Sequence, residues 1–281
     1  MGHQLKRWGA VFILPTLIAF VISFLVPFLM GIYLSFTEFT TISNARFVGI
    51  DNYVKVFTGS KDFLNALWFT VKFTVVSVIT INVIAFLLAY ILTGKLRGTN
   101  AFRTVFFMPN LIGGIVLGYI WQLIINGVLG NFGVDITNRA AYGFWGLVIL
   151  MNWQMVGYMM IIYIAALQNV PPEMHEVAAI DGANRRQSLR HIILPLVMPA
   201  VTICTFLTLT NAFKLFDQNY ALTGGAPGKE TSMLALDIFR TFYGSVGNEG
   251  IGQAKAVIFF VLVALIALLQ MKLSSRFEKD D

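Results

Sequence analysis

Side chains that could perform covalent or metal chemistry are sparse in this sequence of 281 residues. The histidines His3, His175 and His191 are scattered, and no pair has the spacing of a zinc-binding helix. A glycine-rich stretch at 224–229 superficially resembles a phosphate loop, but its spacing is short and Glu230 occupies the Ser/Thr position. No serine elbow, carboxylate pair or activated cysteine stands out. We therefore predict no catalytic site, metal site or cofactor, and no enzyme.

The remaining candidates for chemistry are uncharged polar side chains within apolar runs. Asn110, Gln154 and Asn211 carry amide donors and acceptors that suit hydroxyl groups. Tyr158 adds an apolar ring face and a hydroxyl. Such groups cost free energy inside a membrane unless they have partners or water. Each one could instead hydrogen-bond a neighbouring helix, so binding and packing both remain open for each residue.

The composition identifies the solvent of this chain as a lipid bilayer. Hydrophobic residues make up 57% of the sequence and charged residues only 12%, whereas a soluble domain has about 25% charged residues. The net charge of +6 is spread between apolar blocks instead of forming one basic face, so we predict no nucleic-acid binding. Cys204 is the single cysteine, which excludes an intramolecular disulfide.

Six apolar runs are long enough to cross a membrane, since about 20 helical residues span about 30 Å of hydrocarbon. Their apolar residues run all round the helix, which is typical of spanning helices rather than amphipathic ones. The first run is too long for a signal peptide and lacks a cleavage site, so we expect a retained span. We predict an all-α polytopic membrane protein with a single domain over residues 1–281 and spans near 10–34, 71–93, 104–125, 144–167, 192–214 and 254–272.

The distribution of basic residues predicts the orientation. Short basic segments prefer the cytoplasm, which places both termini there. Two long outer segments (36–70 and 215–253) and one polar inner loop (168–191) result. The spans contain almost no charged residues, so we expect energy to come from another subunit. The inner basic residues are Lys6, Arg7, Lys95, Arg97, Arg103, Arg185, Arg186, Arg190, Lys272, Arg276 and Lys279.

The inner loop contains clear signals for two short helices. Pro171 and Pro172 can begin a helix, and Asp181 and Gly182 break it. Asn184 can then cap a second short helix. Two short helices joined by a sharp turn would make a compact knob suited to a cleft on another protein. A solvated basic loop at the membrane surface explains the same residues, so both interpretations stay open on physical grounds.

This loop, at about 168–194, also resembles the EAA loop of bacterial ABC-importer permeases. The matching residues are Glu176, Ala178, Ala179, Asp181, Gly182 and Ala183, followed by Ile192, Leu194, Pro195 and Pro199. Val177 departs from the pattern, since the family usually has Ala there. Further residues resemble the carbohydrate type of this family, and within it the chain is similar to the maltose-permease-like larger subunit. These residues are Phe47, Val48, Gly49, Ile50, Asp51, Asn52 and Tyr53, then Phe102, Arg103 and Pro109, and finally Leu222, Thr223, Gly224, Gly225 and Pro227.

The resemblance implies a type I importer permease fold in the bacterial cell membrane, in contact with lipid. It implies a second homologous permease, two cytoplasmic ABC ATPases and an extracytoplasmic sugar-binding protein as partners. In that family the EAA loop inserts into a groove on the ATPase. The residues that this implies for coupling here are Glu176, Ala178, Ala179, Asp181 and Gly182.

The same resemblance implies a sugar site near the bilayer midplane, between two related permeases, where transporters commonly bind substrate. We therefore expect a permease subunit for a mono- or oligosaccharide. The residues implied to face the sugar are Asn110, Gly114, Gln154, Met155, Tyr158, Thr208, Asn211, Ala212 and Leu215.

Three alternatives make different demands on the sequence. A permease for another polyol-like solute, such as glycerol phosphate, should line its cavity with cations, and only Lys214 comes close. A secondary carrier working alone should have ionisable residues within its spans. A membrane-embedded enzyme should gather acids, bases or metal ligands at one membrane depth, and no such cluster is visible.

Overall fold

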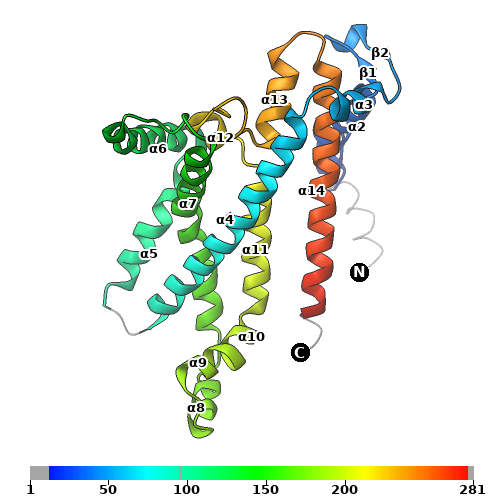
Figure 1. Cartoon of the computed structure of the whole chain (residues 1–281). Helices are drawn as coiled ribbons and strands as arrows, with labels where there is room; N and C mark the ends of the chain where they lie inside the picture. Colours follow the sequence, from blue (N-terminus) through cyan, green and yellow to red (C-terminus); the bar gives the residue numbers. More distant parts are fainter. Residues whose placement is uncertain (1–12, 95–96, 278–281) are drawn as a thin grey trace, which may run out of the picture. The chain divides into compact units, whose positions relative to one another are not determined.

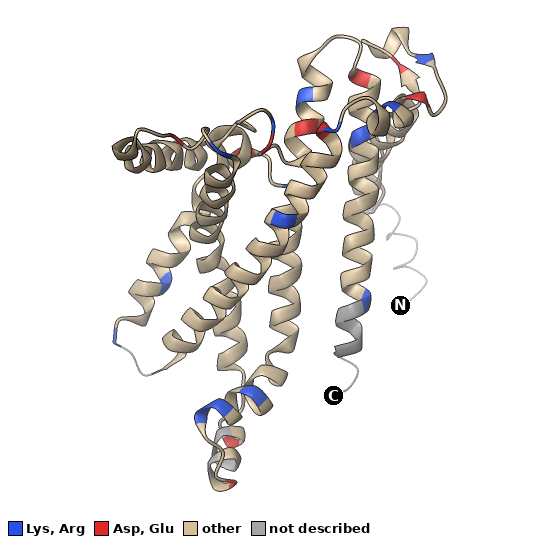
Figure 2. Cartoon of the chain, in the orientation of Figure 1, with Lys and Arg blue, Asp and Glu red and all other residues tan. Residues whose placement is uncertain are grey.

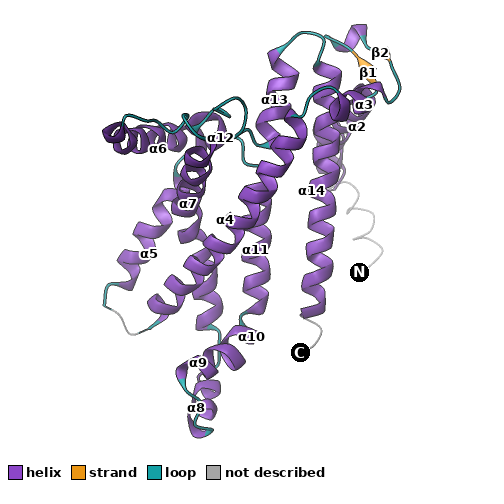
Figure 3. Cartoon of the chain, viewed as in Figure 1, coloured by secondary structure: helices purple, strands orange, loops and turns teal. Residues whose placement is uncertain are grey.

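The computed structural model describes residues 13–94 and 97–277, and these are almost entirely helical (Figures 1 and 3). The chain divides into two compact units. The first comprises Met1–Phe63 and Asp237–Val261, and the second comprises Leu64–Leu236 and Leu262–Asp281. The single domain over residues 1–281 stays a prediction.

Five helices within the described residues are long and apolar enough to cross a membrane: Ile13–Leu34, Asp62–Thr93, Gly114–Phe132, Ala140–Gln168 and Glu249–Lys272. A sixth candidate is a bent pair, Arg185–Leu196 and Met198–Phe213, whose two parts meet at 69°. The bend lies between Pro195 and Pro199, each at the start of a helical segment, because a proline cannot continue a helix. The prediction of an all-α protein with about six membrane helices is confirmed.

The first unit contains a small hairpin beside helix ends. Its elements are η1 (Val21–Leu25), α2 (Val26–Leu34), β1 (Thr37–Glu38), η2 (Ile42–Asn44), β2 (Arg46–Phe47), α3 (Asp51–Thr58), most of α13 (Leu234–Gly244) and the start of α14 (Glu249–Phe277). The strands are antiparallel, with Thr37 opposite Phe47. The buried Asn52 amide donates to the carbonyls of Ser35 at 3.0 Å and Thr37 at 2.8 Å. Asn52, one of the matching residues at positions 47–53, therefore ties α3 to the hairpin.

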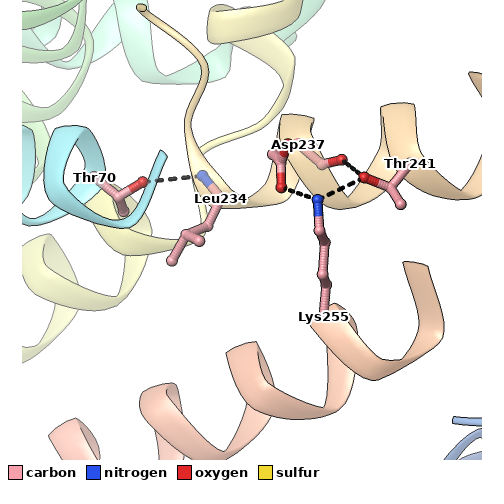
Figure 4. Close-up of polar contacts among 5 residues, drawn as sticks. All are labelled: Thr70, Leu234, Asp237, Thr241 and Lys255. Atoms are coloured by element: carbon pink, nitrogen blue, oxygen red, sulfur yellow. Dashed lines mark hydrogen bonds and ion pairs between the residues drawn. The ribbon is translucent and has the colours of Figure 1, made fainter. Parts of the chain in front are cut away.

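A buried ion pair joins α13 to α14 in this unit (Figure 4). The Lys255 ammonium donates to Asp237 Oδ2 at 2.7 Å and to Thr241 Oγ1 at 2.8 Å. The Lys255 and Asp237 side chains are only 7% and 8% exposed. The Thr241 hydroxyl donates in turn to the Asp237 carbonyl at 2.8 Å. Both charges are thus buried together with hydrogen-bond partners, as low-dielectric surroundings require.

The second unit is built around α7 (Ala140–Gln168). Its other elements are α4 (Asp62–Thr93), α5 (Thr99–Phe107), η3 (Met108–Leu111), α6 (Gly114–Leu129), η4 (Gly130–Phe132), α8 (Pro172–Ile180), α9 (Arg185–Ser188), η5 (Leu189–Ile193), α10 (Leu194–Leu196), α11 (Met198–Phe213) and α12 (Asp217–Leu222). The most apolar part of α7 is 67% buried within the chain, against 28% for α4. Helix α7 is therefore the central helix of this unit, and the others leave apolar faces for lipid or partners.

Uncharged polar contacts hold α4, α7 and α11 together. The Tyr163 hydroxyl of α7 donates to Asn82 Oδ1 of α4 at 2.7 Å. The Asn82 amide donates to Thr208 Oγ1 of α11 at 3.4 Å. A second contact from α7 to α4 runs from the Asn152 amide to Thr80 Oγ1 at 2.9 Å. These bonds give buried polar groups partners without placing a charge among the membrane helices.

The predicted bounds of the span at 104–125 are wrong, because the chain breaks within them and the membrane-length helix runs over Gly114–Phe132. Helix α5 ends at Phe107, a short 3₁₀ turn follows, and Ile112 and Gly113 are extended before α6 begins. Pro109 lies in the turn, where its missing N–H removes a helical hydrogen bond. Hydropathy alone does not register such a break. Helix α4 also begins at Asp62, earlier than the predicted residue 71.

Candidate functional site

A cavity of about 350 Å³ lies among η3, α7, the end of α11 and α12. Five of the nine residues predicted to face substrate line it: Asn110, Gln154, Met155, Asn211 and Leu215. The other lining residues are Met151, Lys214, Phe216, Asp217 and Gln218. The cavity thus combines amides, thioethers and aliphatic carbon with two charged side chains.

Two buried glutamines form the polar floor of the cavity. The Gln218 amide donates to Gln154 Oε1 at 2.7 Å, and both side chains are 8% exposed. The Gln154 amide donates to the Ile112 carbonyl at 3.3 Å, in the break between α5 and α6. The interrupted span therefore supplies a free backbone carbonyl that positions this pair.

Two asparagines complete the set of neutral hydrogen-bonding groups. The Asn110 amide lies 3.6 Å from Met155 Sδ, a weak acceptor. The Asn211 amide donates to the Leu207 carbonyl at 2.8 Å, one turn earlier on its own helix. A hydroxyl ligand could replace the weak sulfur contact at small cost, because water-exposed amides exchange partners readily.

One charge of each sign borders the cavity. Lys214 and Asp217 both line it, and both are exposed. The lining therefore carries no net formal charge.

Close backbone packing brings α12 to this position. A Cβ added at Gly114 would lie 2.7 Å from Asp217 Cβ, and one at Gly118 would lie 2.6 Å from Ala221 Cβ. Either contact is too short for any larger residue without movement of α12. The Gln122 amide also donates to the Leu222 carbonyl at 2.9 Å. Gly114 thus lies against the lining residue Asp217, and its predicted role toward substrate stays a prediction.

Besides Gly114, three further predicted residues lie outside the lining. The Tyr158 ring packs against Phe107, with centroids 6.4 Å apart. The fully buried Thr208 hydroxyl donates to the Cys204 carbonyl at 2.7 Å, and Ala212 is also fully buried. The structure thus places Thr208 and Ala212 in helix packing, and their roles toward substrate stay predictions.

Sequence analysis missed the lining residues Met151, Lys214, Phe216, Asp217 and Gln218 as site residues. Phe216–Gln218 follow the last turn of α11 and were assigned to an outer segment. The available signal was the charged residue Lys214 at a span end, followed closely by Asp217 and Gln218. Their return to the cavity depends on tertiary packing against α6.

The predicted knob has the expected local structure. Helix α8 begins at Pro172, and Gly182 takes a left-handed φ of 71° after it. Asn184 caps α9, accepting from the backbone N–H groups of Arg186 at 3.1 Å and Gln187 at 3.0 Å. The Gln187 side chain accepts from the Asn184 N–H at 2.8 Å, completing a capping box.

The surface of the knob is partly apolar. Ile180 is 85% exposed and Met174 is 41% exposed, whereas Ala178 is buried. Ala178 borders a second cavity of about 540 Å³, whose lining also includes Tyr90 of α4 and Leu167 of α7. The C-terminal ends of α4 and α7 therefore meet beside the knob. Glu176 and Ala179 belong to α8, but their side chains lie outside the described residues.

Charged residues avoid the middle of the long helices. Figure 2 shows long helical stretches without Lys, Arg, Asp or Glu, and charges gathered toward helix ends and loops. Arg185 and Arg186 lie on α9, and Arg190 lies in η5. No group of three potential metal ligands occurs among the residues that the structure describes. The predicted basic residues Lys6, Arg7, Lys95 and Lys279 lie outside that part of the chain.

Comparison with known proteins identifies the family. The model for "Binding-protein-dependent transport system inner membrane component" matches residues 95–279. The chain is 43% identical to the probable starch degradation products transport system permease protein AmyD of Thermoanaerobacterium thermosulfurigenes, covering 97% of this chain and 96% of that protein. It is 32% identical to the multiple sugar-binding transport system permease protein MsmF of Streptococcus mutans, covering 97% of each.

A further relative and a solved structure agree with this assignment. The trehalose/maltose transport system permease protein MalF of Thermococcus litoralis is 30% identical over 100% of this chain and 97% of its own length. A crystal structure of a bacterial ABC transporter that imports the acidic polysaccharide alginate aligns with a TM-score of 0.82 at 21% identity, covering 98% of both chains. At that identity the structural match supports the fold alone.

The EAA-like loop, the membrane helices and these similarities converge on a transport component rather than an enzyme family. The predicted resemblance to importer permeases is confirmed. This chain belongs to the family of binding-protein-dependent transport system inner membrane components.

Proposed function

We propose that this chain is a permease subunit that carries a neutral mono- or oligosaccharide through the cavity at Gln154 and Gln218. The observation that carries the proposal is the buried amide pair, 2.7 Å apart, in a lining with no net formal charge. Carboxamides can donate to and accept from sugar hydroxyls. The relatives named for starch degradation products, multiple sugars and trehalose or maltose support the same substrate class.

The composition of the lining suits a sugar in a second way. Met151, Met155, Leu215 and Phe216 offer apolar surface, which can cover the C–H faces of a sugar ring. Amides on one side and apolar groups on another match the amphipathic character of a pyranose. A neutral site also explains why the surrounding helices contain uncharged polar contacts.

A phosphorylated polyol is the second candidate, because Lys214 lines the cavity. Asp217 lines the same cavity and would repel an anion, which favours the neutral sugar. The two candidates make opposite predictions for removal of these charges. Lys214→Gln should abolish uptake of a phosphorylated substrate but reduce that of a neutral sugar only modestly.

The knob is the proposed contact with cytoplasmic ATPases. Its exposed Ile180 and Met174, beside a cap-stabilised turn, suit a groove on a partner protein. We assign the coupling role to Glu176, Ala178, Ala179, Asp181 and Gly182. The proposed assembly contains a second homologous permease, two ATPases and an extracytoplasmic sugar-binding protein, with the knob and both termini of this chain in the cytoplasm. The chain itself catalyses no reaction and forms one permease domain.

The substrate proposal is tested with the assembled transporter in proteoliposomes, supplied with ATP and the binding protein. We expect ATP-dependent uptake of labelled maltotriose, falling about tenfold or more in Gln154→Leu because a buried hydrogen bond to substrate is lost. Gln270→Leu is the matched control, since the Gln270 amide donates to the Thr202 carbonyl away from the cavity. Uptake of glycerol phosphate but not of neutral sugars, or full sugar uptake by Gln154→Leu, would contradict the proposal.

Coupling is tested by comparing two glycines with the same backbone conformation. Gly182 has φ +71° and Gly133 has φ +70°, and a Cβ added at either meets nothing within 4 Å. Leucine therefore adds similar strain at both, on the order of 1–2 kcal/mol. Gly182→Leu should keep ATP hydrolysis while sugar uptake per ATP falls severalfold, whereas Gly133→Leu should leave this ratio unchanged. Equal ratios in both variants would refute the assignment of the knob.

A further inference from the structure

A separate cavity of about 470 Å³ lies between the N-terminal parts of α4 and α7. Four aromatic side chains and three polar side chains line it together with two alanines. They are Trp68, Phe69, Phe144 and Trp145 with Asn65, Lys72 and Glu230, and Ala140 and Ala141. Phe69 is buried, so the aromatic surface open to a ligand comes from the two tryptophans and Phe144. None of these residues borders the cavity at Gln154 and Gln218.

The helix lengths place this cavity at the membrane edge remote from the knob. The C-terminal ends of α4 and α7 meet beside the knob. Lys72 precedes the end of α4 by 21 residues, or about 32 Å along the helix axis. Trp145 precedes the end of α7 by 23 residues, or about 35 Å. Since the hydrocarbon layer is about 30 Å thick, the cavity lies at or beyond its outer edge.

The two indole rings are accessible but held in place. Trp68 is 62% exposed and Trp145 is 54% exposed. The Lys72 ammonium lies 5.8 Å from the Trp68 ring centroid. Phe144 packs edge-on against Trp145, with ring centroids 5.4 Å apart, and against the buried Phe69, with ring centroids 5.7 Å apart. These contacts restrict ring motion before any ligand arrives, which lowers the entropy cost of binding.

Three polar side chains line the same cavity as the aromatic rings. Asn65 offers an amide, Glu230 a carboxylate and Lys72 an ammonium around the same cavity. Ala140 and Ala141 carry single methyl groups, so the N-terminal turn of α7 leaves the space open. A cavity of this size lies within the range typical of small-molecule sites.

We propose that this cavity is an outer sugar-binding site, in which a pyranose ring stacks on Trp68 or Trp145 and its hydroxyls bond to Asn65, Lys72 and Glu230. Aromatic rings present an apolar face to the C–H groups of the sugar, and the charged and amide groups suit its hydroxyls. The proposal rests on the proposed sugar specificity. The site would hold sugar on the outer side, before it reaches the cavity at Gln154 and Gln218.

The test measures saturation-transfer difference NMR of maltotriose with the assembled transporter in nanodiscs, without binding protein or ATP. We expect saturation transfer in the wild type and about a fivefold loss in Trp68→Ala and in Trp145→Ala. Trp68→Phe should retain part of the signal, because a ring face remains. Trp153→Ala is the matched control: Trp153 is 44% exposed on α7 and packs on Trp121 at 5.7 Å, away from this cavity.

A variant of the other cavity distinguishes this site from the translocation path. Gln218→Leu should remove at most the small remainder of the signal that the tryptophan variants keep, because that remainder is the share of the cavity at Gln154 and Gln218. Loss of the signal in Gln218→Leu with retention in both tryptophan variants would overturn the outer site while leaving the proposed function intact. Absence of saturation transfer in the wild type would also overturn it, and sugar uptake in proteoliposomes would still report on the proposed function separately.

Membrane anchoring is the competing role for these tryptophans, since indoles gather at membrane interfaces. Lipids brominated along the acyl chain quench indoles that face hydrocarbon. We expect the absolute intensity lost on quenching, per mole of protein, to be the same in the wild type and in Trp68→Ala or Trp145→Ala. A quenched component that disappears in either variant would show that the ring faces lipid, and would overturn the proposal.

Discussion

The two units of the chain bury polar groups in different ways. In the first unit, α13 and α14 are joined by a full ion pair, with Lys255 and Asp237 in contact at 2.7 Å. In the second, α4, α7 and α11 are joined by amide and hydroxyl groups such as Asn82 and Tyr163. Removing one partner of a buried ion pair leaves an uncompensated charge, whereas a neutral group can turn to another partner.

This difference fits the proposal that the second unit carries the substrate. The cavity lies in the second unit, and its amides belong to the same neutral class as the contacts between α4, α7 and α11. Neutral bonds can be exchanged for bonds to substrate hydroxyls at small cost. The ion pair suits a fixed contact, because any rearrangement of α13 against α14 would separate buried charges.

The largest loss of stability is expected when one partner of the ion pair is removed. Asp237→Ala leaves the Lys255 ammonium buried without a counter-charge, keeping the Thr241 hydroxyl and the Phe63 ring as contacts, so the free energy of unfolding should fall by about 3–5 kcal/mol. Unfolding of the purified chain by SDS titration in mixed micelles measures this change. The fixed-contact interpretation would fail if Asp237→Ala lost less than about 1 kcal/mol.

A double variant separates the charge from the shape of the site. Asp237→Leu combined with Lys255→Met removes both charges and keeps apolar volume. Replacement of a buried pair by apolar residues is often neutral, so most of the lost stability should return. A double variant as unstable as Asp237→Ala would instead show that the pair itself stabilises the contact.

Local sequence signals located much of this architecture in advance. Membrane helices follow from long apolar runs, and the knob follows from Pro172, Gly182 and Asn184, whose effects act within a few residues. The bounds of the span that contains Pro109 were misplaced, because an apolar run looks the same whether or not its hydrogen bonds continue. Pro109 was the only local indication of the break.

The features that could not be predicted from the sequence depend on contacts between residues far apart in the chain. The ion pair joins positions 237 and 255 on different helices, and no periodic pattern connects them. The return of α12 to the cavity depends on Gly114 and Gly118, where the absence of a side chain permits close packing. Of the five predicted residues that line the cavity, Gln154, Met155 and Asn211 lie on the regular helices α7 and α11, whose facing positions carry over by resemblance. Asn110 lies in η3 and Leu215 follows α11.

An intermediate loss of stability is expected when one of the neutral contacts in the second unit is removed. Tyr163→Phe removes the hydroxyl that donates to Asn82 at 2.7 Å, and should lower the free energy of unfolding by about 0.6–1.7 kcal/mol. The same SDS titration measures it. Tyr90→Phe is the matched control, because no hydrogen bond links the Tyr90 hydroxyl to the described residues. The rings of Tyr90 and Tyr163 both pack on Phe86. Similar losses in both variants would contradict a specific role for the Tyr163 bond.

The smallest effect on stability is expected at the cavity itself. Gln218→Met keeps the side-chain length but removes the donor to Gln154. Gln154 lies beside the cavity and can bond to water there, so the free energy of unfolding should change by less than about 1 kcal/mol. Sugar uptake in proteoliposomes should nevertheless fall, because one hydroxyl partner is missing. A loss of stability as large as that of Asp237→Ala would make the glutamine pair a structural clamp, and the contrast between the two units would no longer hold.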